Sequence, residues 1–295
     1  MQIPGEVKFI VCVDSSDECK AALRFACMRA KNSKGSVCIL YVIEPNDMQH
    51  FAGVEKVMER EAEEELETIC EKVKEKGNYD FTEFCFLEVV PPFIEDGMEK
   101  CLKKDIDEMT IVPYFLYPGK KVKIAVADAM KYQKDTKIKF LVSKPMTMHK
   151  KLVDLVDNRI VSALEENEIS LPKDKVDVLI IGHGSMDPNA GISINYIVEE
   201  LRQTYKNVDR CYLEIEEPNI EQGIGSCQKN NPEVLVIVFY FLHEGAHVKI
   251  DVNNDLKPAL EKSNLKKTCV TKHLGVDEKM IDLIIERARE VENAN

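Results

Sequence analysis

Short apolar runs alternate with longer stretches of helical period along both halves of the chain. Candidate strands in the first half, enough for a five-stranded sheet, are residues 8–13, 37–43, 84–89, 109–115 and 138–142. Those in the second half are residues 176–181, 210–215, 234–241 and 267–271. Strands that alternate with helices are typical of βαβ units and of a parallel sheet covered on both faces. The pattern predicts an α/β fold of two tandem three-layer α/β/α domains with mainly parallel sheets.

The domain boundary is expected in a polar, proline-bearing stretch at residues 168–174. This stretch follows a helix that the apolar spacing predicts over residues 151–165. We therefore place a first domain at residues 1–168 and a second at residues 172–295. A chain of 295 residues has room for two domains of ordinary size.

An internal repeat relates the two halves. A shift of 126 positions places residues 85–128 on residues 211–254 without a gap, and 19 of the 44 pairs are identical. A shift of 128 extends the repeat to the last helix of each half, where Arg159 pairs with Arg287. Such agreement does not arise by chance, so the sequence predicts two units related by duplication.

Composition limits the partners and the compartment. A formal net charge of -12 argues against nucleic-acid binding over the whole surface, because phosphate backbones are bound by an excess of lysine and arginine. Any anionic ligand therefore needs a local basic patch. The ten cysteines include no C-x-x-C pair, which favours reduced thiols and a cytoplasmic protein. Neither a signal peptide nor a membrane span is evident, so no membrane partner is expected.

Two histidines occupy positions suited to metal chemistry at the expected carboxyl edge of the second sheet. His183 follows one predicted strand, His247 lies beyond another, and Glu214 stands near the end of a third. Open α/β sheets bind ligands at that edge. Two imidazoles and a carboxylate can bind a divalent metal ion, and neutral imidazoles also accept protons. The alternative for His183 alone is a loop histidine bonded to its own backbone.

Residues 243–247 also match H-E-x-x-H, the zinc-protease motif, which requires both histidines one turn apart on a helix. The preceding residues instead indicate a buried strand, and the repeat aligns Gly245 with Gly119 in a loop. We interpret the match as a coincidence and His243 as a bystander.

Three ordered motifs make residues 176–295 resemble the CbiX-type sirohydrochlorin chelatases, class II enzymes that insert cobalt or iron into a tetrapyrrole. The motifs are Gly-His-Gly-Ser-x-Asp-Pro at 182–188, Tyr-Leu-Glu-x-x-x-Pro at 212–218 and Phe-Leu-x-x-Gly-x-His-Val at 241–248. The resemblance implies a Rossmann-like, chelatase-like fold and a tetrapyrrole substrate. The divalent metal would be a second substrate, and cobalt, iron and nickel all accept imidazole ligands.

The resemblance also implies roles for individual residues. His183 and His247 would bind the metal and take up pyrrole protons, and Glu214 would assist. Sirohydrochlorin carries eight carboxylates, so a basic rim is implied as well. Candidate contacts to the tetrapyrrole are Ser185, Lys249, Arg202 and Lys272. For each of the three cations, a solvated surface charge is the alternative.

The first half lacks both histidines. Lys121 stands at the repeat position of His247, and Glu44-Pro45-Asn46 stands where Gly-His-Gly-Ser would be expected, so no metal site is predicted there. About residues 7–77 instead resemble the universal stress proteins, through Phe9-Ile-Val-Cys-Val-Asp-Ser-Ser16 and the alanine-rich helix that follows. The ATP-binding members use a loop Gly-x2-Gly-x9-Gly-Ser/Thr, which this chain lacks, so no ATP is expected.

These resemblances together imply a chelatase of siroheme or cobalamin biosynthesis. A fused, histidine-free half would replace the second subunit of smaller relatives, giving either a monomer with pseudo-dimeric halves or a homodimer. The alternative is a non-catalytic, stress-related protein that binds a metal or a tetrapyrrole.

Overall fold

The computed structural model describes residues 8–13, 36–41, 45–88, 90–243 and 252–294. The chain forms two compact units, residues 1–56 and 57–295. The first unit contains a parallel pair of strands, β1 (Lys8–Val13) and β2 (Ser36–Tyr41). Helix α2 (Pro45–Gly77) begins in the first unit and ends in the second. All the candidate site residues belong to the second unit.

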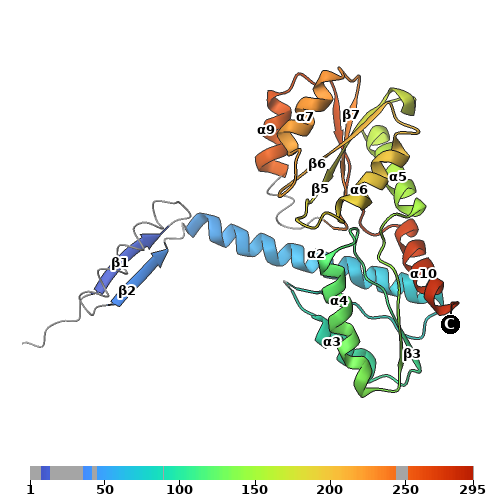
Figure 1. Cartoon of the computed structure of the whole chain (residues 1–295). Helices are drawn as coiled ribbons and strands as arrows, with labels where there is room; N and C mark the ends of the chain where they lie inside the picture. Colours follow the sequence, from blue (N-terminus) through green and yellow to red (C-terminus); the bar gives the residue numbers. More distant parts are fainter. Residues whose placement is uncertain (1–7, 14–35, 42–44, 89, 244–251, 295) are drawn as a thin grey trace, which may run out of the picture. The chain divides into compact units, whose positions relative to one another are not determined.

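A four-stranded parallel sheet forms the centre of the second half (Figure 1). In spatial order its strands are β6 (Asn207–Tyr212), β5 (Asp177–Gly182), β7 (Leu235–Phe239) and β8 (Thr268–Val270). Every residue of β5 and β7 is buried, because side chains alternate between two faces that are both covered.

Helices cover both faces of this sheet. Val178 and Ile180 of β5 pack in one core with α5 (Lys150–Glu166), α6 (Gly191–Leu201) and α10 (Glu278–Glu292). Leu179 and Ile181 pack in another with α7 (Ile220–Lys229) and α9 (Lys257–Lys262). The predicted three-layer α/β/α arrangement with parallel strands is therefore confirmed for the second half.

The first half of the second unit contains a smaller parallel sheet of β3 (Glu108–Ile111) and β4 (Lys139–Val142). Met109 and Phe140 pack there with Met98 of α3 (Ile94–Leu102) and Ala129 of α4 (Lys120–Met130). Helix α10, from the end of the chain, also contacts both strands. The α/β class holds here too, on a smaller sheet.

The single five-stranded sheet predicted for the first half is wrong. Residues 84–88 form no strand and make only an isolated bridge between Phe86 and Phe93, while β1 and β2 pair with each other in the first unit. In the second half the repeat equivalent of residues 81–86 is β6, which pairs with β5. The strand that precedes the expected Gly-His-Gly-Ser position in the first half is β2, which pairs with β1 in the first unit instead. A strand without a neighbour leaves its backbone groups unpaired.

The repeat is nevertheless preserved in local geometry. The bridge between Phe86 and Phe93 has its equivalent between Tyr212 and Asn219, 126 positions further on. A Cβ added to Gly97 would lie 2.9 Å from Cys85 Cβ, and one added to Gly223 would lie 2.7 Å from Cys211 Cβ. Both copies therefore use a glycine to bring a helix close to the same cysteine.

Helices α5 and α10 are exchanged between the halves (Figure 1). Helix α5 follows the first sheet but contacts β7 and β8, whereas α10 contacts β3 and β4. Arg159 on α5 donates to the carbonyls of His273 (2.9 Å) and Leu274, which follow β8. Its repeat equivalent on α10, Arg287, donates to the carbonyl of Thr147 (2.9 Å), which follows β4. The boundary between residues 168 and 172 stays a prediction, and a cut there would separate α5 from the sheet it covers.

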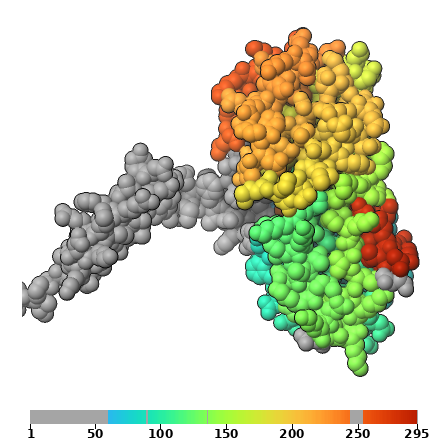
Figure 2. Space-filling model, in the orientation of Figure 1, coloured from blue at the N-terminus to red at the C-terminus, as the bar shows by residue number. Residues whose placement is uncertain are grey.

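The two halves form one packed body. One core contains Leu116 and Met146 of the first half together with Ile194 and Tyr240 of the second. In Figure 2 the green surface of the first half and the yellow surface of the second meet along a continuous boundary on the face shown. Within the described residues, no helix combines the length and the apolar character needed to cross a membrane.

Three of the free thiols, Cys211, Cys227 and Cys269, are buried and pack as small apolar groups. Burial also raises the pKa of the Cys70 thiol to about 12, so this thiol carries little thiolate at neutral pH.

Candidate functional site

His183 stands one residue beyond the end of β5. Gly182, the last residue of β5, pairs in register with Tyr212, the last residue of β6, so Glu214 lies just beyond the end of the neighbouring strand. The strands are parallel, so both side chains emerge at the same edge of the sheet. Their placement follows directly from the buried, apolar sequence of β5, which ends where the polar motif begins.

The side chains of His183 and Glu214 meet at this edge. His183 Nδ1 lies 3.4 Å from Glu214 Oε1 and 3.3 Å from the carbonyl oxygen of Gly184. The His183 side chain is 50% exposed and that of Glu214 58%, so an incoming ligand can reach both groups. A proton on Nδ1 can be donated to the Gly184 carbonyl, beside the Glu214 carboxylate, which leaves the lone pair of Nε2 free for a ligand.

Gly184 allows the two loops to approach this closely. Its φ is +92°, and a Cβ added there would lie 1.9 Å from the carbonyl oxygen of Glu214. The backbone N–H of Glu214 in turn donates to the carbonyl of His183 at 3.1 Å. Only glycine fits both this backbone conformation and this contact.

The segment after Gly184 is held by its own polar side chains. Ser185 N–H donates to Glu216 Oε1 (2.8 Å), and Ser185 Oγ accepts from Asp187 N–H (3.0 Å). Asp187 Oδ1 accepts from both the backbone and the side-chain amide of Asn189, which lowers the pKa of Asp187 below its ordinary value. Within the described residues, Ser185 shapes the loop; its predicted contact with the tetrapyrrole stays a prediction.

The first half contacts this loop directly. Lys120 N–H, at the start of α4, donates to Asp187 Oδ2 at 3.0 Å, and Gly119 packs against the same carboxylate. Ser193 Oγ on α6 donates to the carbonyl of Leu116 at 2.6 Å. These contacts were not predicted from the sequence, although Asp187 belongs to the Gly-His-Gly-Ser-x-Asp-Pro motif. They place the beginning of α4 beside the His183 loop.

The equivalent position in the first half is occupied by an ion pair. Lys121 Nζ bonds to Glu88 Oε1, and these residues are the repeat equivalents of His247 and Glu214. An ammonium group carries no lone pair for a metal ion, and here it also neutralises the one equivalent carboxylate. This geometry supports the prediction that the first half has no metal site.

The remaining candidates divide into two groups. His247 and Lys249 lie outside the described residues, so their roles stay predictions. Arg202 is not brought near His183: it follows the end of α6 and donates to the carbonyl of Val208 (3.0 Å), near the start of β6 at the opposite edge of the sheet. Lys272 pairs with Glu166 at 3.4 Å and is otherwise exposed.

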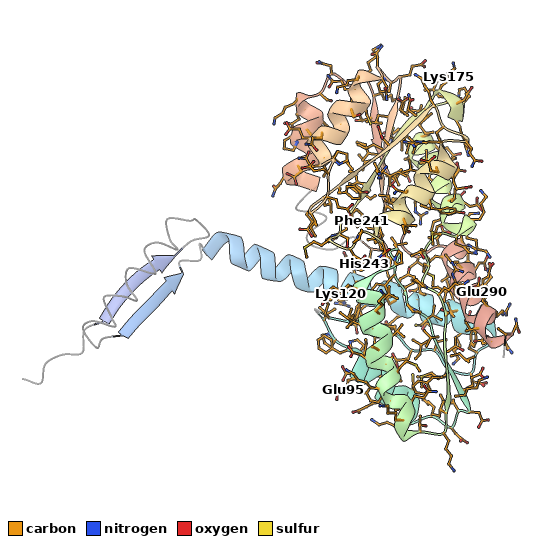
Figure 3. All side chains as sticks on the ribbon, viewed as in Figure 1. Glu95, Lys120, Lys175, Phe241, His243 and Glu290 are labelled. Atoms are coloured by element: carbon orange, nitrogen blue, oxygen red, sulfur yellow. The ribbon has the colours of Figure 1, made fainter. Side chains whose placement is uncertain are left out.

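His243 follows the end of β7 in a non-helical segment, at the carboxyl edge of the sheet (Figure 3). The zinc-protease motif would need a helix at this histidine. The conformation at His243 therefore supports the interpretation of H-E-x-x-H as a coincidence.

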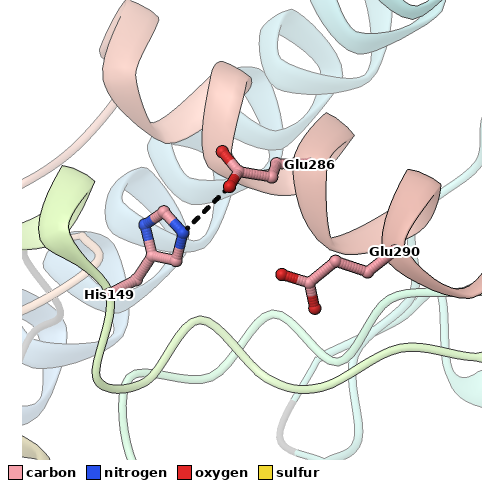
Figure 4. A group of neighbouring side chains, drawn as sticks. All are labelled: His149, Glu286 and Glu290. Carbon is pink, nitrogen blue, oxygen red and sulfur yellow. Dashed lines mark hydrogen bonds and ion pairs between the residues drawn. The ribbon is translucent and has the colours of Figure 1, made fainter.

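A second group of potential ligands lies away from this site and was missed in the sequence. His149, Glu286 and Glu290 place one donor atom each within 4.8 Å of one another (Figure 4). Cations already bind both carboxylates, since Lys151 pairs with Glu286 and Arg287 with Glu290. His149 Nδ1 accepts from Lys151 N–H at 3.2 Å, so in the neutral ring the proton lies on Nε2, which faces Glu286 at 3.3 Å. The cluster therefore joins α5 to α10, and its imidazole offers no free lone pair to a metal.

Family models match most of the chain. A model described as CbiX matches residues 58–163 and 177–291, which covers both halves of the second unit. A model of the universal stress protein family matches residues 8–92 and confirms the resemblance seen in the opening segment.

Curated relatives and a solved structure agree with this assignment. A sirohydrochlorin ferrochelatase from Priestia megaterium is 26% identical over 206 residues, covering 68% of this chain and 74% of that protein. A sirohydrochlorin cobaltochelatase from the same organism is 27% identical over 171 residues, covering 57% and 55%. The structure of SirB from Bacillus subtilis with Fe3+ has a TM-score of 0.68 at 22% identity, covering 79% of this chain and 91% of that one. This likeness confirms the predicted fold.

Proposed function

The chain belongs to the CbiX family, and on that premise we propose that it is a chelatase that inserts a divalent metal ion into sirohydrochlorin, in siroheme or cobalamin biosynthesis. The observation that carries the proposal is the meeting of His183 Nδ1 and Glu214 Oε1, 3.4 Å apart, at the carboxyl edge of the second sheet. An imidazole and a carboxylate at an accessible edge can bind a divalent metal ion and accept protons, which metal insertion needs.

Metal insertion replaces two pyrrole N–H protons by one divalent ion, so the site has to bind the ion and accept two protons. We assign the first task to His183 Nε2, with Nδ1–H held by the Gly184 carbonyl beside Glu214, which fixes the tautomer. When the ion passes to the ring, His183 Nε2 is vacated and takes up one pyrrole proton, and His247 is proposed as the second imidazole, which takes up the other. Neutral imidazole is suited to both tasks near pH 7.

The test is an insertion assay followed by the absorbance change of the tetrapyrrole. We expect His183→Ala to lower the rate by about 10²- to 10⁴-fold, because a metal ligand and a proton acceptor are lost together. His243→Ala, at the same edge of the sheet, serves as the matched control and should retain the wild-type rate. A His183→Ala variant as fast as the wild type would refute the assignment.

The identity of the metal is a separate question. Relatives at about this similarity include both a ferrochelatase and a cobaltochelatase. We propose cobalt or ferrous iron, and a comparison of cobalt, ferrous iron and nickel in the same assay distinguishes them. Tight binding of sirohydrochlorin without insertion of any metal would favour a stress-related binding protein instead, in keeping with the match over residues 8–92.

A further inference from the structure

Two exposed apolar side chains, Met186 and Ile215, come from the segments that carry His183 and Glu214. They are among seven large apolar side chains that are exposed in the part of the chain whose burial is described, and two more, Ile124 and Ile192, lie on α4 and α6. Met186 is 88% exposed in the loop between His183 and Asp187, and Ile215 is 59% exposed directly after Glu214. Single exposed apolar residues are common on proteins, but a group at a ligand-binding edge indicates an apolar ligand.

Positive charge lies beside these side chains. Three of the first four residues of α4 are lysines: Lys120, Lys121 and Lys123. Lys121 is paired with Glu88, whereas Lys120 and Lys123 are exposed and have no ion-pair partner among the described residues. The charge of Lys123 contributes to the lowered pKa of Asp187, so its ammonium group acts on the His183 loop.

The position of these lysines is fixed by the backbone. The bond from Lys120 N–H to Asp187 Oδ2, at 3.0 Å, attaches the first turn of α4 to the loop that carries Met186. Ile124 lies one turn after Lys120 on the same helix face. Figure 3 labels Lys120 at the start of α4 and Lys175 at the far end of the second half.

We infer that this surface is the tetrapyrrole-binding face of the protein, with Met186 and Ile215 against the apolar ring and Lys120 and Lys123 bound to its carboxylates. The inference rests on the proposed function and adds the residues that recognise the substrate. A chain with a net charge of -12 repels a polycarboxylate, so exposed lysines beside the His183 loop are the natural contacts.

The carboxylate contacts are tested by equilibrium binding of metal-free porphyrins, followed by quenching of their fluorescence. Uroporphyrin, an octacarboxylate, and mesoporphyrin, a dicarboxylate, are the probes. In the full chain, Lys120→Gln with Lys123→Gln should raise the dissociation constant for uroporphyrin about threefold to tenfold. The change for mesoporphyrin should be smaller, and the difference should shrink at about 0.5 M salt. The control variant carries Lys134→Gln and Lys175→Gln, which remove the same charge from exposed positions elsewhere.

The ring contact is tested by Met186→Gln, which keeps the length of the side chain but makes it polar. This substitution should raise the dissociation constants of both porphyrins by a similar factor of about ten, because both present the same ring face. Met148→Gln, at another exposed methionine, is the control and should change neither dissociation constant.

These measurements test the tetrapyrrole contacts and the chelatase activity separately. If the wild type inserts metal while the double lysine variant binds uroporphyrin as tightly as its control, the inference is overturned and the proposed function stands. If the wild type neither binds sirohydrochlorin nor inserts metal, the proposed function itself fails. Equal losses for both porphyrins in the lysine variant would also contradict carboxylate recognition.

Discussion

His183 depends on the residue that follows it. Gly184 adopts a left-handed backbone conformation, and its missing side chain lets the carbonyl of Glu214 come within contact of the His183 turn. A side chain at residue 184 would push the two loops apart and separate the imidazole from the carboxylate. The chemistry of the site therefore rests on a residue that makes no contact with the metal.

Gly184→Ala is expected to lower the rate of metal insertion by about 100-fold, because a displacement of about 1 Å at a reacting group costs that much. Gly191→Ala is the control: a Cβ there meets nothing within 4 Å, so the rate should not change. The insertion assay measures both, and circular dichroism checks that both variants fold. Equal rates for the two variants would show that the spacing of the loops is unimportant.

The sequence predicted His183 and Glu214 at one sheet edge because each follows an apolar run that is long enough for a buried strand. It did not predict the bond between Lys120 N–H and Asp187, which joins residues 67 positions apart. That contact depends on how two halves pack, and neither residue carries a local signal of it. Arg202 shows the same limit, since its helix runs back to the opposite edge of the sheet.

At the scale of elements, the exchange of α5 and α10 is the feature that is hardest to predict from the sequence. Both helices carry an apolar face, and their arginines at 159 and 287 are repeat equivalents. An apolar face predicts that a helix covers a sheet but not which of two related sheets. No strand forms at residues 84–88 because the strand expected beside them, β2, pairs with β1 instead.

Arg287→Ala should lower the free energy of unfolding by about 2 to 3 kcal/mol, since a buried charged donor is lost and the Thr147 carbonyl keeps no partner from α10. Arg289→Ala, two residues away and exposed, should change it by less than about 0.5 kcal/mol. Urea unfolding measures both. If the two variants were equally stable, the arginine would not fasten α10 to the first half.

The free energy of unfolding should also depend on pH, through Glu286 on α10. The hydrogen bond from Lys151 holds the pKa of Glu286 below its ordinary value, so the unfolded state binds more protons than the folded state near that pKa. The contribution is complete above about pH 4.5 and is lost as the pH falls through the folded pKa. Urea midpoints of Glu286→Gln should therefore vary less with pH below about 4.5 than those of the wild type. If the urea midpoints of Glu286→Gln and the wild type fell in parallel below about pH 4.5, the protonation of Glu286 would not be coupled to unfolding.

At the scale of the molecule, the second unit behaves as one body with a shared core. Leu152 and Ile160 of α5 and Ile281 and Leu283 of α10 belong to the same core as the central strands of the second half. A cut at the predicted boundary between residues 168 and 172 would divide this shared core.

A fragment of residues 172–295 should not unfold cooperatively, because β7 and β8 lose the helix that covers them. A fragment of residues 57–295 should unfold cooperatively and keep the insertion activity, since it contains the whole second unit. Heat-capacity calorimetry and the insertion assay test both fragments. A cooperative transition in the shorter fragment would show that α5 is dispensable.

The exchanged helices have a consequence for synthesis on the ribosome. The strands β3 and β4 emerge early, but α10, which contacts both, spans Glu278–Glu292 and is made only after the whole second sheet. The first half must therefore wait for these residues, with part of its apolar surface open to chaperones. A truncation before Glu278 would damage the half of the protein that was made first.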